Sequence, residues 1–448
     1  MKRLFSLCLF IIIAFAIGAE EIPVRKSNYL EISTFHFPCA DGTDIIFWDD
    51  SLNGDSDIFA QKISSNGICL WNENICVVDE PGDQFIVDMV ATSDHNCIIL
   101  WQDNYQTSSS NYFMQKITSS GQCLWNSSGI PLIDESFWIE PIKLVADNAG
   151  GAHIVYSKEW YLNHYLYRQK IDTFGNLLFP FANTIIYTDT MFVALKNAVS
   201  DDAGGVIVAM SKNEHPLDPQ KTYLIHLSAD GNITGNIPMV MDAGLNTDNY
   251  NILKSIGNQI ILWGTYYSSN NTCTSFRKMD TEGNLLSELP TSFQFPSYLT
   301  DGHYPPAATP EGGIIFAWEE TSSNLLKIQK YNSDLLPVWQ EGGVNVGTLE
   351  GDEITFQLWA KNEGSVLVSW SILFGSITQE LIYNAQLINP QGLRCWGDNG
   401  MIIGNSAYFM SYASSVNADH NIFVWYENDY TLMGVKHRVI NNAGIDLL

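Results

Sequence analysis

The chain has little positive charge. Its 448 residues hold 22 Lys and Arg against 49 Asp and Glu, a formal net charge of −27 at pH 7. Loss of Lys2 and Arg3 with an N-terminal leader would leave 22 − 2 = 20 basic residues, and 20 − 49 gives −29. A surface of this sign repels nucleic acid and anionic lipid and favours cations or basic partners. We therefore expect no nucleic-acid partner.

The sequence also lacks the short signatures of common catalytic sites. No HExxH, GxSxG, GxxxxGK or GxGxxG segment occurs. The paired carboxylates of a glycosidase leave no local signature, so that class of enzyme stays open. The nine His are scattered along the chain, and we interpret each as a strand or loop residue rather than a metal ligand.

Long apolar runs are absent except at the N-terminus. There, residues 4–17 are apolar apart from Ser6, follow the charged Lys2 and Arg3, and end at the small residues Gly18 and Ala19. The run is shorter than the ~20 residues of a spanning helix, so residues 1–19 are predicted to be a secretory signal peptide. Cys8 lies inside the run without the pattern of a lipoprotein site. The sequence predicts an exported bacterial protein, secreted, periplasmic or at the cell surface, without a membrane span.

Cysteine is scarce and not spaced for pairing. Removing Cys8 with the leader leaves 8 − 1 = 7 Cys, an odd number without a CxxC spacing. Export to an oxidising compartment favours disulfides. However, Cys69 and Cys123 occupy equivalent positions in the repeats described next, and a propeller would hold such positions too far apart to bridge. We predict mostly buried free thiols.

The sequence does contain one strand-like segment that recurs eight times. Each copy is an apolar run, and the runs close 52 to 55 residues apart at Trp48, Trp101, Tyr156, Met210, Trp263, Trp318, Trp370 and Trp425. A turn rich in Gly, Asp and Asn precedes most runs, and a further strand and turn follow. Four short strands in such a period are typical of a propeller blade, and no segment sustains the stripe of a helix. We therefore predict an all-β chain in which residues 20–448 form a single eight-bladed β-propeller of four-stranded antiparallel blades.

A second repeated pattern places an aromatic residue four positions after a Gly. It occurs at Gly67/Trp71, Gly121/Trp125, Gly175/Phe179 and Gly392/Trp396. With these residues the chain resembles the tryptophan-docking repeats of eight-bladed quinoprotein-like propellers, in which a Trp packs onto the neighbouring blade. Residues 60–71, AQKISSNGICLW, are also similar to repeats of secreted bacterial surface proteins. The resemblance covers nearly all of the mature chain and implies the fold far more strongly than a function.

The resemblance does not extend to a cofactor. Quinoproteins usually carry an acidic residue four positions before the Gly, where this chain has Ile63, Ile117 and Ile171. We therefore expect no quinone cofactor.

A Gln recurs six positions before the second turn of the repeat. The five copies are Gln61, Gln115, Gln169, Gln329 and Gln386. A ring of amides could be a ligand site, or each amide could bond the backbone of its own or an adjacent blade. Because buried polar groups must be paired, we predict that these residues are part of the scaffold.

Residues 49–57 resemble the first half of a calcium-binding loop. Asp49, Asp55 and Asp57 place oxygen donors at alternate positions, and Gly54 stands at the sixth. The twelfth position, which should carry a bidentate Glu, is Ala60. A solvated hairpin turn around Gly54 is the preferred interpretation, with calcium binding as the alternative.

Any ligand site is expected in the connectors that enter the first strand of each repeat, because function sits on loops above a rigid scaffold. Three connectors are acidic and aromatic, and their candidate ligand-binding residues are Trp138, Glu140, Asp301, His303, Tyr304, Glu350, Asp352 and Glu353. The alternative is a solvated acidic rim. The rings of Trp138 and Tyr304 favour the first interpretation, since such rings stack on sugars or peptide side chains.

The predicted function is a non-enzymatic binding or scaffold propeller, a monomer that recognises a glycan or a protein. One alternative is a carbohydrate-active enzyme with paired carboxylates about 5 to 9.5 Å apart on the connectors. Another is an envelope-assembly factor like the quinoprotein-fold lipoproteins, which the missing lipobox disfavours. Residues 21–28 have no role in the repeat, and we predict that they complete the outer edge of the last blade.

Overall fold

The structure is a computed structural model of the chain. It describes residues 34–50, 54–103, 111–133, 142–160, 163–179, 185–213, 215, 221–240, 251–255, 259–268, 271–280, 284–288, 306–320, 323–349, 353–374, 380–406, 412–416, 420–428 and 433–446. The regular elements in these residues are all β-strands, as the repeat pattern predicts.

The strands of the first four blades follow one another along the chain. Blade 1 contains β1 (Thr34–Pro38), β2 (Asp44–Asp50), β3 (Asp57–Ile63) and β4 (Ile75–Val78). Blade 2 contains β5 (Gln84–Ala91), β6 (Cys97–Asp103), β7 (Asn111–Ile117) and β8 (Ile130–Ile133). Blade 3 contains β9 (Ile142–Ala146), β10 (Ala152–Trp160), β11 (Asn163–Ile171) and β12 (Ile185–Asp189). Blade 4 contains β13 (Val193–Ser200), β14 (Val206–Lys212), β15 (Lys221–Leu227) and β16 (Ile233–Val240).

The remaining strands form three further blades and a last sheet. Blade 5 contains β17 (Asn251–Lys254), β18 (Gln259–Ser268), β19 (Asn271–Asp280) and β20 (Leu285–Glu288). Blade 6 contains β21 (Ala307–Ala308), β22 (Ile314–Glu320), β23 (Leu325–Tyr331) and β24 (Val344–Thr348). Blade 7 contains β25 (Glu353–Ala360), β26 (Val366–Phe374), β27 (Glu380–Ile388) and β28 (Met401–Ser406). The last sheet contains β29 (Tyr412–Val416), β30 (His420–Asn428) and β31 (Met433–Asn441).

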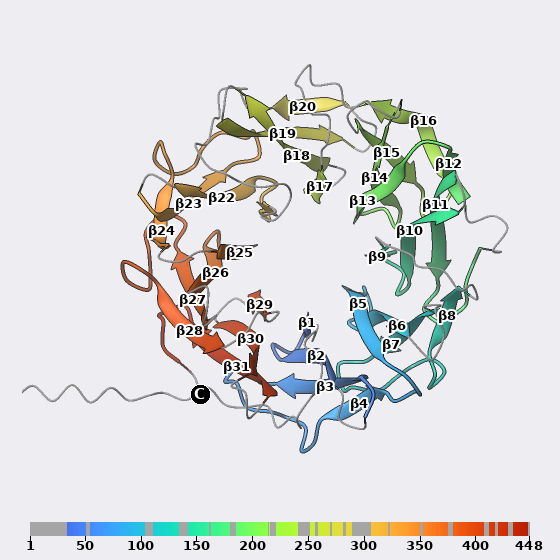
Figure 1. Cartoon of the computed structure of the whole chain (residues 1–448), viewed down its shortest axis with the longest axis horizontal. Helices are drawn as coiled ribbons and strands as arrows, with labels where there is room; N and C mark the ends of the chain where they lie inside the picture. The colour runs from blue at the N-terminus through green and yellow to red at the C-terminus, as the bar shows by residue number, and fades with distance from the viewer. Residues whose placement is uncertain are drawn as a thin grey trace, which may run out of the picture.

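The sheets are arranged around a central opening, with the first strand of each blade innermost (Figure 1). The fold is therefore an all-β propeller, but the prediction of eight four-stranded blades is wrong. The described residues form seven four-stranded blades, and the remaining sheet has three strands. After its third strand, Asp446 forms an isolated bridge with Ile440, and the described residues of this sheet include no fourth strand. Residues 21–28, predicted to complete this edge, lie outside the described residues.

The hydrophobic core lies between neighbouring blades rather than inside them. Ile58 and Ala60 of blade 1, for example, share one buried cluster with Ile99 and Trp101 of blade 2. The second strand of each blade is buried on both faces because it has a blade on either side, as the all-buried pattern of β2 shows. This explains the continuous apolar runs of the sequence, since strands covered on both faces need not alternate.

The aromatic residues of the Gly pattern pack on the next blade. A Cβ added at Gly121 of blade 2 would lie 2.8 Å from the Trp71 ring of blade 1. The ring nitrogen of Trp125 donates a hydrogen bond of 3.2 Å to the carbonyl of Thr173 in blade 3. The same pairing of ring and Gly occurs for Trp125/Gly175, Phe179/Gly231, Trp339/Gly392 and Trp396/Gly444.

The recurring Gln residues bond the backbone of their own blade, so the scaffold prediction is confirmed. In blade 1 the amide of Gln61 donates to the carbonyl of Trp71 at 3.2 Å and accepts from the Trp71 N–H at 3.1 Å. Gln169 makes the same two bonds to Phe179. Gln115, Gln329 and Gln386 also accept from the N–H of the ring residue, but they donate to the carbonyl of the residue after it. Each amide thus holds the turn that carries the docking ring.

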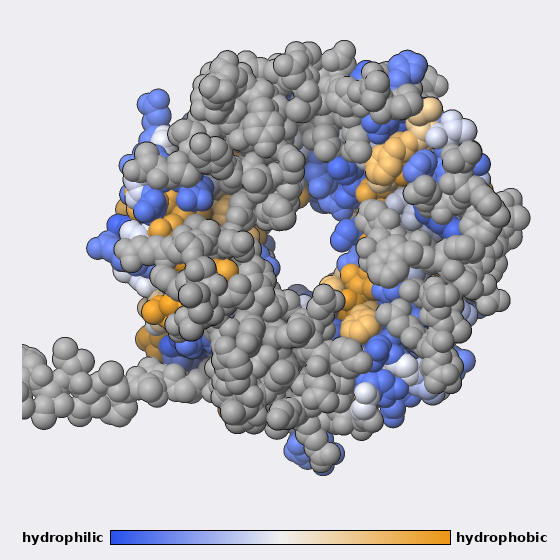
Figure 2. Space-filling view, in the orientation of Figure 1, coloured by the Kyte–Doolittle hydropathy of each residue, from blue (hydrophilic) through white to orange (hydrophobic). Residues whose placement is uncertain are grey.

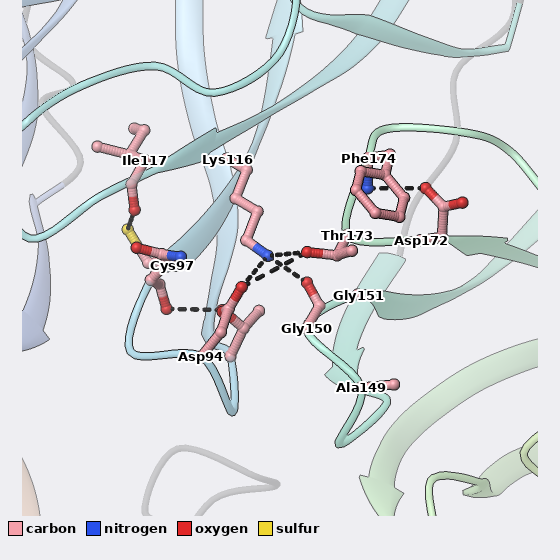
Figure 3. A network of polar contacts seen from close by, with 12 residues as sticks. Asp94, Cys97, Lys116, Ile117, Ala149, Gly150, Gly151, Asp172, Thr173 and Phe174 are labelled. Carbon is pink, nitrogen blue, oxygen red and sulfur yellow. Dashed lines mark hydrogen bonds and ion pairs between the residues drawn. The ribbon is translucent and has the colours of Figure 1, made fainter.

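In several blades, the Lys that follows this Gln or its equivalent forms hydrogen bonds with the following blade. Sequence analysis did not predict these contacts. Lys116 is fully buried, and its Nζ lies 2.6 Å from Asp94, 2.5 Å from the carbonyl of Gly150 and 2.8 Å from the hydroxyl of Thr173 (Figure 3). Lys62, Lys170, Lys278 and Lys330 likewise donate to backbone carbonyls of the following blade.

Asp44 joins the last sheet to blade 1. Its carboxylate is fully buried and lies 3.1 Å from Nε2 of His36 and 3.7 Å from Nε2 of His420 in β30. Nearby, Nε2 of His437 contacts the carbonyl of Gly67 at 2.7 Å. The first and last sheets are therefore joined by polar contacts.

We expect Asp44→Asn to destabilise the fold at pH 7 by about 1–3 kcal/mol. Burial tends to raise the pKa of Asp44, but the neighbouring imidazoles of His36 and His420 outweigh it and hold the pKa below its ordinary value. A lowered folded-state pKa adds stability above the unfolded pKa of about 3.9, and this is lost as pH falls through the folded value. Unfolding midpoints of both proteins between neutral and acid pH should converge below about pH 4. A gap independent of pH contradicts this role.

The six described cysteines are free thiols. Cys39 and Cys97 are buried, Cys69 and Cys123 are partly exposed, and Cys76 and Cys395 are exposed, so the prediction of mostly buried thiols is wrong. The last two differ most from it. They are exposed because they lie on the outer strand of blade 1 and on the outer turn of blade 7.

Candidate ligand site on the connector face

Most of the candidate residues from the sequence lie outside the described residues. These are Trp138, Glu140, Asp301, His303, Tyr304, Glu350 and Asp352. Glu353 begins β25, where its backbone pairs with that of Leu373. Whether these connectors share one pocket stays a prediction.

The three acidic residues of the calcium-like loop are described, and they do not converge. Asp50 lies directly opposite Asp57 across the β2–β3 ladder, so Asp49 points to the other face of the blade. The carboxylate of Asp55 accepts a hydrogen bond of 2.7 Å from the Gly82 N–H. Within the described parts of the chain, no group of three or more His, Cys, Asp or Glu could hold a metal ion. Calcium binding, the alternative to a solvated hairpin turn, stays untested.

A different group of side chains gathers where blades 3 and 4 meet, at the end of the propeller that carries the connectors. We call it the Lys212 cluster: His164 at the start of β11, Tyr187 and Asp189 on β12, Phe192 just before β13, Lys212 at the end of β14, and Tyr223 on β15. In the view of Figure 2, hydrophobic residues are exposed over β13 to β15. The cluster combines polar groups with the ring of Phe192, a residue that is 41% exposed.

The polar part of the cluster is a hydrogen-bonded triad. The ammonium of Lys212 lies 2.7 Å from the carboxylate of Asp189 and donates to the hydroxyl of Tyr187 at 2.8 Å. That hydroxyl in turn donates to Asp189 at 3.2 Å. The Lys212 ammonium also lies 5.5 Å from the ring centroid of Tyr187 and 5.9 Å from that of Tyr223, within cation–π range. The triad is only partly buried, so a ligand can reach it.

The electrostatics of the triad keep Asp189 and Lys212 ionised. Burial tends to raise the pKa of Asp189, but hydrogen bonds from Lys212 and from the backbone N–H of Met191 hold it below its ordinary value. Burial likewise tends to lower the pKa of Lys212, and its bonds to Asp189 and Tyr187 raise it instead. At neutral pH the cluster thus presents a carboxylate acceptor and an ammonium donor side by side.

Phe192 supplies the apolar surface beside this triad. Its ring is 41% exposed and meets the His164 ring edge-on, with centroids 5.4 Å apart. The carbonyl of Phe192 accepts a hydrogen bond from the N–H of Asn213, next to Lys212. The ring is therefore anchored through its backbone while one face stays open to solvent.

Sequence analysis expected a site on the connectors but did not select this one. The connector between Asp189 and Val193 is short, with one aromatic and no acidic residue, and so looks ordinary beside the longer acidic connectors. Lys212 lies two residues after the closing Met210 of its repeat, where blades 1 and 2 have Asp50 and Asp103. The position is not acidic throughout, since the third repeat carries Lys158 and the seventh Ile372, so Lys212 does not stand out in the sequence.

A hollow, separate from the Lys212 cluster, lies on the outer side of the ring between blades 6 and 7. It measures about 590 Å³ and is lined by Trp339, Gln340, Val344, Asn345, Gln391, Gly392, Leu393, Arg394, Gly397 and Asp398. Its cation, Arg394, forms an exposed pair with Asp398, and its aromatic ring, Trp339, is buried against Gly392. The hollow offers neither an open ring nor a free charge, so the Lys212 cluster is the better candidate.

Comparisons with known proteins place the chain by shape alone. No family model matches it, and no curated protein matches by sequence. A polysaccharide lyase of the PL25 ulvan lyase family aligns with a TM-score of 0.47 at 11% identity, covering 82% of this chain and 96% of that one. A eukaryotic initiation factor aligns with a TM-score of 0.41 at 7% identity (95% and 89%). An α-L-arabinofuranosidase from Fusarium graminearum aligns with a TM-score of 0.33 at 9% identity (94% and 97%). These values carry no argument for a shared activity.

The described residues contain no helix long and apolar enough to cross a membrane.

Proposed function

We propose that the protein is an exported, non-enzymatic glycan-binding propeller whose Lys212 cluster contacts the sugar. The observation that carries this proposal is the open ring of Phe192 beside the triad of Lys212, Asp189 and Tyr187. A sugar ring has an apolar C–H face and a polar edge of hydroxyl groups. The first matches an exposed aromatic ring, and the second matches neighbouring donors and acceptors.

Binding accounts for the cluster better than hydrolysis does. A glycosidase needs two carboxyl groups, one of them with a raised pKa so that it can act as an acid. Among the described residues of the cluster Asp189 is the single carboxyl group, and its pKa is lowered. The large polar groups deeper in the ring, such as Lys116 and Gln115, bond one blade to another or close a turn. They support a rigid platform rather than a reaction.

Phe192→Ala is expected to weaken glycan binding about tenfold, because it removes the stacking surface and leaves the triad in place. The ligand is first found by applying the mature protein to a glycan array. Its affinity for wild type and variant is then measured by calorimetry. The fold should be unaffected, since Phe192 is 41% exposed and belongs to no buried core cluster among the described residues.

Phe174→Ala is the matched control. Phe174 is 80% exposed and lies on the turn between β11 and β12, at the opposite end of the same blade from the connectors. This variant should bind like wild type. An array without any glycan signal, or equal losses in the two variants, contradicts the proposed function.

A further inference from the structure

Arg168 occupies a position in β11 that is apolar in the other four-stranded blades. The residue directly before the recurring Gln, or its equivalent, is Ala60, Met114, Leu224, Phe276, Ile328 and Ala385 in blades 1, 2, 4, 5, 6 and 7. All six are buried in the core. In blade 3 the same position holds a guanidinium. A charge in place of a core residue breaks the local rule of the fold, and such exceptions concentrate at functional sites.

The guanidinium of Arg168 has no acceptor among the described residues. Its Nε and Nη1 atoms are buried and form no hydrogen bond. Its one recorded partner is the ring of Phe179, whose centroid lies 4.5 Å from Cζ. Burial without a counter-ion lowers the pKa of Arg168. An unpaired buried charge is costly, because the desolvation of its N–H groups is not offset by any bond.

The surroundings hold the guanidinium in place. Phe179 covers one face of it and itself packs on Gly231 of blade 4, where an added Cβ would lie 2.4 Å from the Phe179 ring and 3.1 Å from Nη1 of Arg168. The Arg168 side chain as a whole is partly exposed, so one edge of the planar group reaches solvent at the junction of blades 3 and 4. A rigid, stacked and unpaired guanidinium with an open edge is preorganised for a planar or tetrahedral oxyanion.

We propose that Arg168 is the binding residue of an oxyanion site, which takes a carboxylate or sulfate group of a ligand between blades 3 and 4. This site does not depend on the Lys212 cluster, because none of its described contacts involves a residue of that cluster. The ligand supplies the acceptors that the protein lacks. A purely structural Arg168 would gain only its cation–π contact with Phe179, which does not satisfy the buried N–H groups.

The test compares wild type with Arg168→Met, which installs the residue that blade 2 carries at Met114. Thermal unfolding is followed with sodium glucuronate, sodium sulfate and neutral D-glucose. Sodium chloride of equal ionic strength is the control for general salt effects. Each anion is raised to about 50 mM, enough to saturate a millimolar site. Glucuronate and sulfate report the two sources of the oxyanion separately.

Without ligand, Arg168→Met is expected to unfold about 1–4 °C higher than wild type, since it removes an uncompensated charge. Glucuronate or sulfate should raise the unfolding temperature of wild type by about 2 °C or more and leave the variant unchanged. Glucose and chloride should act equally on both. The site is refuted if neither anion stabilises wild type beyond chloride, or if the variant responds to the anions as wild type does.

Discussion

Lys116→Met is expected to lower the free energy of unfolding by about 2–4 kcal/mol. The Lys116 ammonium has no solvent exposure, and it holds Asp94 of blade 2 together with the Gly150 carbonyl and the Thr173 hydroxyl of blade 3 (Figure 3). Met fills a similar volume but leaves the buried carbonyl without a donor. The loss is measured by denaturant unfolding, with the midpoint and the slope compared to wild type.

Lys62→Met is the matched control in blade 1. Lys62 makes the equivalent contacts, with Asp41 at 3.0 Å and the Ser119 carbonyl at 2.9 Å, but its side chain is 12% exposed and Asp41 is 54% exposed. Water can replace part of those bonds, so a loss of about 1 kcal/mol is expected. Equal losses in the two variants would show that burial of the ammonium does not set its contribution.

Gly400→Ala should be at least as damaging, with an expected loss of about 3–5 kcal/mol. Gly400 has a φ of +71°, which a side chain disfavours, and an added Cβ would lie 2.3 Å from the Ala385 carbonyl oxygen and 3.0 Å from the Trp370 ring. Neither neighbour can move cheaply, since one is strand backbone and the other is core. Thermal and denaturant unfolding both measure the effect.

Gly397→Ala separates the two causes within the same loop. Gly397 has a φ of +81°, but nothing lies within 4 Å of an added Cβ. Its substitution should therefore cost only the backbone strain of about 1 kcal/mol. If Gly400→Ala lowers the free energy of unfolding no more than Gly397→Ala does, the close approach of the β27 carbonyl and the Trp370 ring to Gly400 does not contribute to stability.

The repeat made the propeller architecture predictable, because every blade must bury both faces of its second strand and so needs a continuous apolar run. The closing residues Trp48 and Trp101 lie within β2 and β6, the second strands of blades 1 and 2, and both are buried. Gln61 was predictable for a related reason: an amide repeated in buried strands has to be satisfied by the scaffold. The three described strands of the last sheet were not predictable. The pairing of an outer strand depends on neighbours in space, which the local sequence pattern does not identify.

The polar side chains that connect blades were harder to foresee. Lys116 follows a Gln in a strand, where a Lys normally lies on a solvated face, and only the packing of blade 3 against blade 2 buries it. Phe192 and Lys212 are 20 residues apart in sequence (212 − 192) and come together because β13 and β14 pair through Val193 and Lys212. Arg168 did leave a signal, since alignment of the repeats shows an Arg at an apolar position, but its lack of a partner is visible only in three dimensions.

The most direct test of the proposed function is the position of a bound sugar. A crystal structure of the mature protein with the glycan selected by the array should show a sugar ring against the exposed face of Phe192. Its hydroxyl groups should lie within hydrogen-bond distance of Lys212 and Asp189. A sugar bound instead between two carboxylates on the connectors near Asp301 or Asp352, with the Lys212 cluster empty, would contradict the account and favour the enzyme.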